Sequence, residues 1–477
     1  MCARATSSTD SRADGESERC AAIRAFPPRR RLRPRRRSSP VTPLPVARTV
    51  PQDGALRRAR PLVVGCAARR GGHLGRCWME YGWTEEHVAF RQQVRDFLDE
   101  HATPALFEEL REGERDGLAR EAGEGEFGHS RGPELRAFRK AMNEAGYTNM
   151  GWPVEYGGQG KDALHAFILA EELWYLGIPQ DHLSVGSVGR TIMRFGTEEQ
   201  KRDWLPEIVA GDMTFALGYT EPNAGTDLAS LQTRATRDGD EWVINGQKIY
   251  GGFGGATHGW LAARTDPDAP KHQGISVFIF PTNVPGITVR PMGTMGRIIT
   301  SETFFDNVRL PADALFGELN RGWYYMTNAL DLERVMIEPQ SLYQRRVDAL
   351  VEHIEEQRPE LKDDPVVQIR LAEATVDSEV SRALAMTNAI MVQNGITPTM
   401  EGAMVKVWGS EARYRMDSLA LDLLGPEGGL RRENEDAPAG GKLEENYRGS
   451  SVHRFAGGTN DVLRRIIATR GLGLPRG

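Results

Sequence analysis

The chain has 477 residues, which is more than one ordinary domain, so we expect two or three packed units. Its net charge of −6 is uneven: residues 1–78 hold 18 arginines, no lysine and five acidic residues, a net of +13, which leaves −19 for the remainder. The acidic remainder argues against nucleic-acid binding, and no run approaches the roughly 18–20 apolar residues that a membrane span needs.

Residues 1–78 are rich in Arg, Pro and Ser and show no helical or strand period, so we predict a disordered extension. It could be a transit peptide, a nucleic-acid-binding tail, or sequence translated upstream of the true start. We favour the last, because Met79 is soon followed by a predicted helix from Thr84. No signal-peptide core is evident, so we expect a cytoplasmic location. The segment contains all four cysteines: Cys2, Cys20, Cys66 and Cys77.

Residues 79–211 are predicted to form an N-terminal helical domain. Its first helix has an apolar face made of Phe90, Val94, Phe97 and Leu98. Thr197 and Gln200 have the spacing of a capping box, which predicts a helix that continues to Val209.

Residues 212–318 have the short period of strands and are predicted to form a small antiparallel β domain. The turn signals Asp238-Gly239 and Asn245-Gly246 separate neighbouring strands. We expect strands at residues 214–219, 231–237, 241–244, 247–250, 260–264, 275–281 and 287–291.

Residues 319–477 are predicted to form a C-terminal helical bundle, with long helices at 323–355, 364–393 and 400–424 and an exposed loop at 431–442. The fold class is therefore α+β, in the order helices, strands, helices. The ten histidines show no metal-ligand spacing, so we predict no metal site.

The stretch 218–227, GYTEPNAGTD, leaves a strand and gathers Pro, Gly and small hydroxyl residues. Gly225 has no Cβ, and Thr220 and Thr226 can donate hydrogen bonds, so the loop suits an electron-rich ring or a thioester lying close to the backbone. On spacing alone, a tight turn without a ligand is the favoured interpretation.

Further stretches follow in a recognisable order over about residues 83–475: GWPVEYGGQG, TEPNAGTD, DGDEWVINGQKIY, FFDNVRLPADALFGELNRGW, LDLERVM and AGGTNDVLRRIIATRGLGLP. Together they resemble the acyl-CoA dehydrogenase family. The resemblance implies a helical–β–helical fold with FAD between the β domain and the last helical domain. It also implies an acyl-CoA substrate, an electron-transfer flavoprotein as acceptor, and a homodimer, homotetramer or hetero-oligomer.

The same resemblance implies the site residues. Cofactor contacts would come from Tyr219, Thr220, Gly225, Thr226, Tyr250, Gly251, Gly252, Gly425, Gly428, Thr459 and Asn460. Substrate contacts would come from Thr226, Asp331, Arg334 and Gly458. Gly425 and Gly428 could equally be a helix stop, since glycine ends helices without any ligand.

Removal of a proton α to a thioester requires a general base. In much of the family this carboxylate lies just before the C-terminal Gly-Thr pair, where this chain has Gly457. A second branch, which includes isovaleryl-CoA and some steroid-CoA dehydrogenases, carries the base before an arginine on the first long helix of the last domain. The pair Glu333-Arg334 matches that position, so Glu333 is the predicted base. The alternative is an ordinary charged cluster on a solvated helix.

Two departures from the family bear on function. After Tyr250, the usual hydroxyl residue is replaced in a Gly-rich run, Gly251 to Gly255, which suggests a widened or mobile loop near the flavin. Residues 357–364 lack the Arg and Phe-Gly pair that reaches a neighbouring subunit's FAD in many relatives. The second departure resembles heteromeric dehydrogenases of sterol side-chain breakdown and favours a bulky, branched or steroid-derived acyl-CoA. The alternatives are a partner subunit without catalysis and a flavin oxidase or monooxygenase on the same fold.

Overall fold

The computed structural model describes residues 62–70, 73–81, 83–115, 132–296, 299–334, 340–396 and 398–475. The chain divides into Met1–Leu62 and a compact unit from Val63 onward. Two nine-residue strands, β1 (Leu62–Arg70) and β2 (His73–Tyr81), form a two-stranded sheet. The prediction that residues 1–78 contain no strand is therefore wrong here. The sequence carries a hairpin signal, since Gly71-Gly72 lies between the two segments. Residues 1–61 lie outside the described ranges.

The N-terminal domain is helical in its described part, as predicted. Thr197 and Gln200 form the capping box at the start of its last helix, and the apolar face of the first helix is buried. The helices are α1 (Glu85–His101), α2 (Pro104–Arg115), α3 (Pro133–Glu144), α4 (Ala163–Leu176), α5 (Gly189–Phe195) and α6 (Glu198–Ala210), with a π-helical turn at His182–Val188.

The middle domain is an eight-stranded sheet in the order β10-β7-β6-β4-β5-β9-β8, with β3 paired to β6. The strands are β3 (Phe215–Gly218), β4 (Arg234–Asp238), β5 (Glu241–Gly251), β6 (His258–Arg264), β7 (Ile275–Pro281), β8 (Ile287–Gly293), β9 (Ile299–Pro311) and β10 (Leu315–Phe316). The sheet is mainly antiparallel, as predicted, but β6 pairs in parallel with β3 and with β4, which the sequence did not predict. The chain between β3 and β6 contains the whole β4–β5 hairpin, so it is long enough to return to the same end of the sheet.

Asn245-Gly246 is not a turn, and the two strands predicted around it are one strand, β5. The register against β9 shifts between Ile244 and Gly246, as in a β-bulge. Gly246 has φ +153°, and a Cβ there would lie 2.6 Å from the Thr233 hydroxyl oxygen, so no side chain fits. The Asn245 carboxamide oxygen accepts a hydrogen bond from the Asn307 backbone N–H at 2.9 Å, which fixes the bulge across the sheet.

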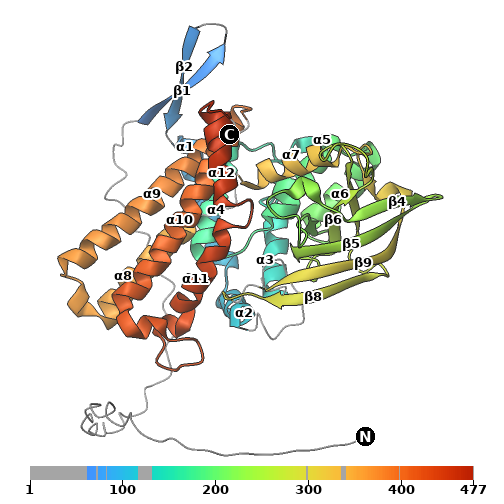
Figure 1. Ribbon diagram of the computed structural model, residues 1–477. Coiled ribbons are helices and arrows are strands. Elements are labelled where there is room, and N and C mark those ends of the chain that lie inside the picture. The colour runs from blue at the N-terminus through green and yellow to red at the C-terminus, as the bar shows by residue number, and fades with distance from the viewer. Residues whose placement is uncertain are drawn as a thin grey trace, which may run out of the picture. The chain divides into compact units, whose positions relative to one another are not determined.

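The C-terminal domain is a bundle in which α8, α9 and α10 run side by side (Figure 1). Its helices are α7 (Gly322–Arg334), α8 (Gln340–Gln357), α9 (Pro365–Gln393), α10 (Thr399–Leu424), α11 (Lys442–Ser450) and α12 (Asn460–Ile466). The predicted helix 323–355 is described as two elements, α7 and α8, and residues 335–339 between them lie outside the described ranges. Nowhere in the described ranges does a helix have the length and apolarity needed to cross a bilayer.

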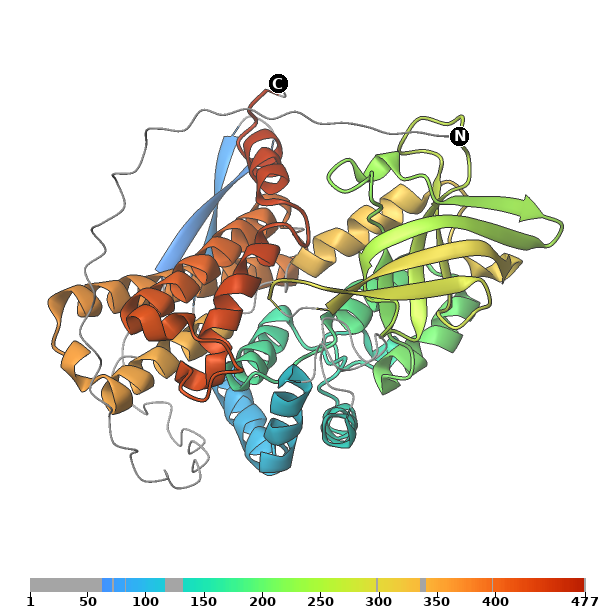
Figure 2. The same ribbon diagram turned by 60° about the horizontal axis from the view of Figure 1, so that its bottom comes forward.

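Helix α7 connects the β domain to the C-terminal bundle, because it contacts both β7 and α10 (Figure 2). Its first residue is held closely against the sheet: a Cβ on Gly322 would lie 2.7 Å from the Ser276 Cα. Only glycine allows this approach, so the start of α7 is fixed relative to β7.

Candidate functional site

The loop after β3 and the end of β5, both predicted to bind the cofactor, lie side by side. The backbone N–H of Ile249 donates to the Thr220 carbonyl at 2.9 Å, which brings Thr220 next to the segment that leads into Tyr250. Within the described ranges, the half-buried Thr220 side chain makes no hydrogen bond to the protein. Its hydroxyl is therefore available to a ligand.

Tyr250 combines an exposed ring with an unusual backbone. Its ring is 63% exposed and its φ is +66°, a conformation that costs an L-residue roughly 1–2 kcal/mol. Such strained residues cluster at functional sites. The following glycine run is anchored at its centre, because Phe253 is only 2% exposed and packs where a Cβ on Gly218 or Gly259 would otherwise lie. An exposed aromatic ring thus lies next to the Thr220 loop on a well-anchored segment.

Tyr219, by contrast, belongs to the core. Its side chain is 6% exposed, and its hydroxyl accepts a hydrogen bond from Trp260 Nε1 at 2.7 Å. Only the backbone of Tyr219 could therefore meet a cofactor. Further along the loop, mutual backbone hydrogen bonds between Glu221 and Ala224 close a tight turn, and Gly225 and the exposed Thr226 follow it.

Side chains of α10 hold the segment that leads into α12. Lys406 Nζ donates to the Gly458 carbonyl and to Asn460 Oδ1, each at 2.8 Å. Asn460 is 4% exposed and also donates to Glu411 at 3.1 Å. The Thr459 hydroxyl accepts from the Val462 backbone N–H and caps α12. The structure therefore gives the Asn460 side chain a supporting role, which the resemblance alone did not imply.

Gly425 and Gly428 have a structural explanation. Gly425 ends α10 at φ +61° and ψ −144°, and a Cβ on Gly428 would lie 3.0 Å from the Leu421 carbonyl oxygen. The positive φ of Gly425 favours glycine at the end of α10, and Gly428 is tightly packed against the last turn of that helix, which agrees with the helix-stop interpretation. Whether they also meet a cofactor stays a prediction.

Glu333 and Arg334 are the last two residues of α7, and their side chains lie outside the described residues. Asp331, slightly earlier on the helix, is half-buried. Because α7 packs against α10, the helix that carries the predicted base lies against the helix that holds Gly458 and Asn460.

Three domain profiles of one family match the chain consecutively. "Acyl-CoA dehydrogenase, N-terminal domain" matches residues 84–212, the middle domain 216–308 and the C-terminal domain 320–472. The chain belongs to the acyl-CoA dehydrogenase family. Members of this family are flavoproteins, oxidoreductases that act on the CH–CH group of acyl-CoA.

The similarity to individual acyl-CoA dehydrogenases covers nearly their whole length. "Acyl-CoA dehydrogenase FadE26" of Mycobacterium tuberculosis is 37% identical over 410 residues, which are 83% of this chain and 99% of the relative. The structure "Tcur3481-Tcur3483 steroid ACAD" is 37% identical with a TM-score of 0.73, covering 83% of this chain and 99% of that one. A chain of the ChsE4-ChsE5 complex from Mycobacterium tuberculosis is 36% identical with a TM-score of 0.72. The match covers 84% of this chain and 100% of that one.

Two charged residues of this acyl-CoA dehydrogenase form a buried pair that the sequence did not predict. Lys248 Nζ lies 2.8 Å from Glu221 Oε1, and their side chains are 1% and 7% exposed. Burial lowers the pKa of Lys248 to about 8, against the raising effect of Glu221. Burial raises the pKa of Glu221, but the Lys248 charge and the hydrogen bonds to its carboxylate outweigh this and hold it below its usual range. Strand alternation offered a signal, since it puts Lys248 on the same face as Trp242 and Ile244.

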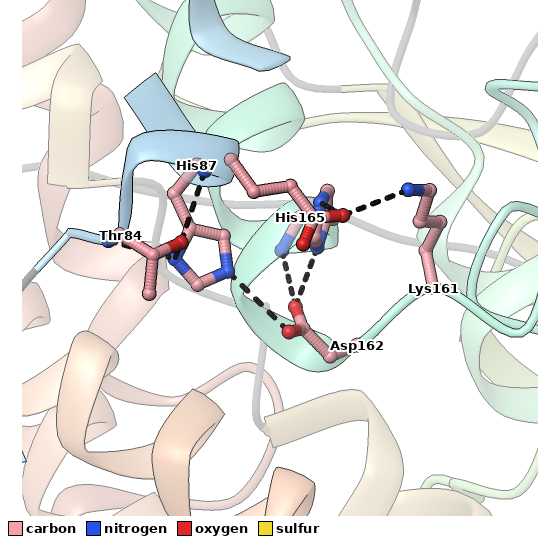
Figure 3. Close-up of polar contacts among 6 residues, drawn as sticks. Thr84, His87, Lys161, Asp162 and His165 are labelled. Carbon is pink, nitrogen blue, oxygen red and sulfur yellow. Dashed lines mark hydrogen bonds and ion pairs between the residues drawn. The ribbon is translucent and has the colours of Figure 1, made fainter. Parts of the chain in front are cut away.

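A second missed cluster joins α1 to α4: His87, Asp162 and His165 have potential ligand atoms within 4.8 Å of one another. Figure 3 shows both rings directed at Asp162, with His87 Nε2 at 3.3 Å and His165 Nδ1 at 2.7 Å from its oxygens. Burial raises the pKa of Asp162, but the hydrogen bonds from the two histidines hold it below its usual range. Asp162 also caps α4 by accepting from the His165 backbone N–H.

The hydrogen bonds of this cluster explain its arrangement without a metal ion. The Thr84 backbone N–H donates to His87 Nδ1 at 3.3 Å, and His87 Nε2 lies 3.3 Å from Asp162. His165 Nδ1 lies 2.7 Å from Asp162, and His165 Nε2 is the ring nitrogen left without a hydrogen bond among the described residues. It faces Glu86 Oε1 at 3.4 Å, a carboxylate already paired with Lys161. We interpret the cluster as a capping junction between two helices.

His182, at the start of the π-helical turn, should make stability fall in acid. Trp174 Nε1 donates to His182 Nε2 at 3.1 Å, and burial lowers the pKa of His182 to about 4. Because the unfolded value is near 6.5, the unfolded chain binds this proton first, so the contribution is present above pH 6.5 and is lost towards pH 4. We expect a loss of about 3 kcal/mol from this group.

Urea unfolding at several pH values would measure this loss. In His182→Gln the carboxamide oxygen can still accept from Trp174 but does not titrate, so the decrease between pH 6.5 and 4 should be smaller by that amount. Equal decreases in both proteins would contradict the assignment to His182.

Proposed function

We propose that this chain is an FAD-dependent dehydrogenase for a bulky, branched or steroid-derived acyl-CoA, with Glu333 as its general base. Family membership supports the reaction class. The observation that carries the cofactor proposal is the backbone hydrogen bond from Ile249 to Thr220, because it holds Thr220, whose hydroxyl is free, beside the residue that precedes the exposed Tyr250.

The residues at this place fit a flavin. A flat, electron-rich ring needs a stacking surface and a few directed donors, and Tyr250 and Thr220 offer these. The half-buried Gly252 adds no Cβ to the backbone after Tyr250, whereas Gly251 is buried and the position of its absent Cβ lies 3.0 Å from the Leu217 carbonyl oxygen. Thr226 is exposed beyond the Glu221–Ala224 turn, and we propose that it contacts the thioester or its pantetheine chain. When bound, FAD would supply the hydride acceptor for the substrate Cβ.

In the proposed mechanism, the Glu333 carboxylate takes the proton from the substrate Cα. The bond pair left on Cα forms the new double bond as the Cβ hydride departs. Arg334 would orient the carboxylate and Asp331 would lie towards the coenzyme A portion. Hydrogen-bond donors near the thioester oxygen, among them the backbone at Gly458, would stabilise its developing negative charge.

The acyl class and the assembly follow from the relatives. The name of one similar structure contains "steroid ACAD", and another is a complex of two components, ChsE4 and ChsE5. We propose a comparably bulky acyl group and an assembly with a related subunit, with an electron-transfer flavoprotein as the final acceptor. An apolar stripe on α9 is compatible with such an assembly, since Val366, Ile369 and Val376 are 60–65% exposed.

The test is the visible spectrum of the purified full chain before and after addition of short, branched and steroid-like acyl-CoAs without oxygen. A flavin band that bleaches with the bulky thioesters would support the proposal. Bleaching followed by rapid oxygen consumption in air would favour an oxidase. A chain that neither holds added FAD nor bleaches would favour a partner subunit without catalysis, in line with the missing hydroxyl at Gly251-Gly252.

A further inference from the structure

We propose that Lys248 is a positioning residue which, together with Glu221, holds loop 219–221 in the conformation that presents Thr220 to the flavin. The inference rests on the proposed function, because it concerns the same cofactor site. It assigns a role to two buried charges that would not themselves touch substrate.

Two consecutive residues of β5 hold three consecutive residues of the loop. Lys248 Nζ donates to the Tyr219 carbonyl at 3.1 Å and to Glu221 Oε1 at 2.8 Å. Between these contacts, the Ile249 backbone N–H donates to the Thr220 carbonyl at 2.9 Å. Thr220 is therefore held by its own backbone and by both neighbours, while its side chain remains available.

The Glu221 carboxylate extends this connection to the segment that enters β4. Besides Lys248, it accepts hydrogen bonds from the backbone N–H groups of Gln232 at 2.6 Å and Thr233 at 2.9 Å. A buried carboxylate with three donors has little freedom to move. Loss of the lysine would leave both this carboxylate and the Tyr219 carbonyl without their charged donor.

A role in positioning explains why an ion pair stands here. Apolar residues of similar size often replace a buried ion pair without loss of stability, so stability alone is a weak reason for burying two charges. An apolar pair cannot donate to the Tyr219 carbonyl. The ammonium group can bind both the backbone and the carboxylate, and this fixes the loop.

The experiment compares Lys248→Met, Glu221→Gln and the double variant of the full chain. Three quantities are measured: the urea midpoint, the Kd for added FAD, and hydrogen–deuterium exchange of residues 219–226 without FAD. The matched control is Lys271→Met, because Lys271 pairs with Asp227 of the same loop at 2.6 Å but both side chains are about 60% exposed.

We expect Lys248→Met to raise the Kd for FAD and to speed exchange of the loop amides by at least about tenfold each, the effect of losing one charge-assisted hydrogen bond. Glu221→Gln keeps the hydrogen bond from Lys248 to the Tyr219 carbonyl. Its Kd for FAD and its rate of loop exchange should therefore stay within about threefold of those of the unmodified chain. The double variant should recover the urea midpoint but keep the tenfold defects, because the carbonyl still lacks its donor. Lys271→Met should change neither the Kd for FAD nor the exchange rate of the loop amides by more than about twofold.

A folded double variant with exchange and Kd within about twofold of the unmodified chain would overturn the proposal, since the pair would then act only through charge balance. If Lys248→Met does not fold, the double variant decides alone. An unmodified chain that does not bind FAD would defeat the proposed function. The exchange measurement would still decide whether Lys248 holds the loop.

Discussion

Replacing Glu333 by glutamine should slow acyl-CoA-dependent flavin bleaching by about 10²–10⁴-fold, the usual contribution of a positioned general base. Glutamine has nearly the same shape but cannot accept the Cα proton. Binding of FAD and of acyl-CoA should change little, because no positive charge is introduced. Stopped-flow absorbance of the flavin band under anaerobic conditions measures the rate, and the shift of the band on adding substrate measures binding.

The matched control for this substitution is Glu318→Gln. Glu318 lies shortly before α7 and its side chain is 74% exposed, so the same chemical change there should leave the rate within about twofold. Glu333→Asp keeps a carboxylate and should retain more activity than glutamine does. A Glu333→Gln protein that bleaches at the unmodified rate would exclude Glu333 as the base and reopen the search for it.

The largest loss of stability is expected from Glu171→Ala. Glu171 lies on α4, is 7% exposed, and accepts hydrogen bonds from Arg91 of α1 at 2.7 Å and from Arg382 of α9 at 2.5 Å. Both arginines also lie over the ring of Trp83. Without Glu171, the partly buried Arg382 loses this carboxylate while Arg91 keeps its pair with Glu172 at 2.5 Å, so the free energy of unfolding should fall by about 3–4 kcal/mol, towards the lower end for a broken buried ion pair.

Urea unfolding compares this variant with Glu198→Ala, whose side chain is 88% exposed and pairs with Lys201. Because the Glu198 carboxylate itself is solvated, its removal should cost less than about 1 kcal/mol. Equal losses for the two substitutions would show that the Arg91–Glu171–Arg382 network does not hold the two helical domains together.

Secondary structure was predictable where local signals agreed with packing. The capping box at Thr197 and Gln200 is present, and Gly239 turns the chain between β4 and β5 at φ +60°. Asn245-Gly246 misled because this dipeptide is typical of a hairpin turn, but here it continues β5 opposite a bulge in β9, where Asp306 and Asn307 face the single residue Asn245. The deciding contact, with Thr233 and Asn307, comes from elsewhere in the chain.

The candidate site was predictable in its residue types but not in its supports. The resemblance pointed to Thr220 and Tyr250, whose available hydroxyl and exposed ring agree with that role. It did not predict that the Asn460 side chain accepts a hydrogen bond from Lys406, or that the Tyr219 hydroxyl accepts one from Trp260. These partners lie more than 40 residues away, and no local pattern records a pairing over that distance.

Helix α7 also places a constraint on how this enzyme can change. Gly322 fixes its start against β7, and Glu333 comes eleven residues later, about 16 Å along the axis at 1.5 Å per residue. Inserting or deleting one residue between them would turn the carboxylate by about 100° around the helix without altering any residue of the site. If Glu333 is the base, as proposed, evolution or design can vary the α7 side chains outside Gly322 and the proposed site but not the length of the helix, and a chimaera of two such dehydrogenases should exchange this helix together with the strand that anchors it.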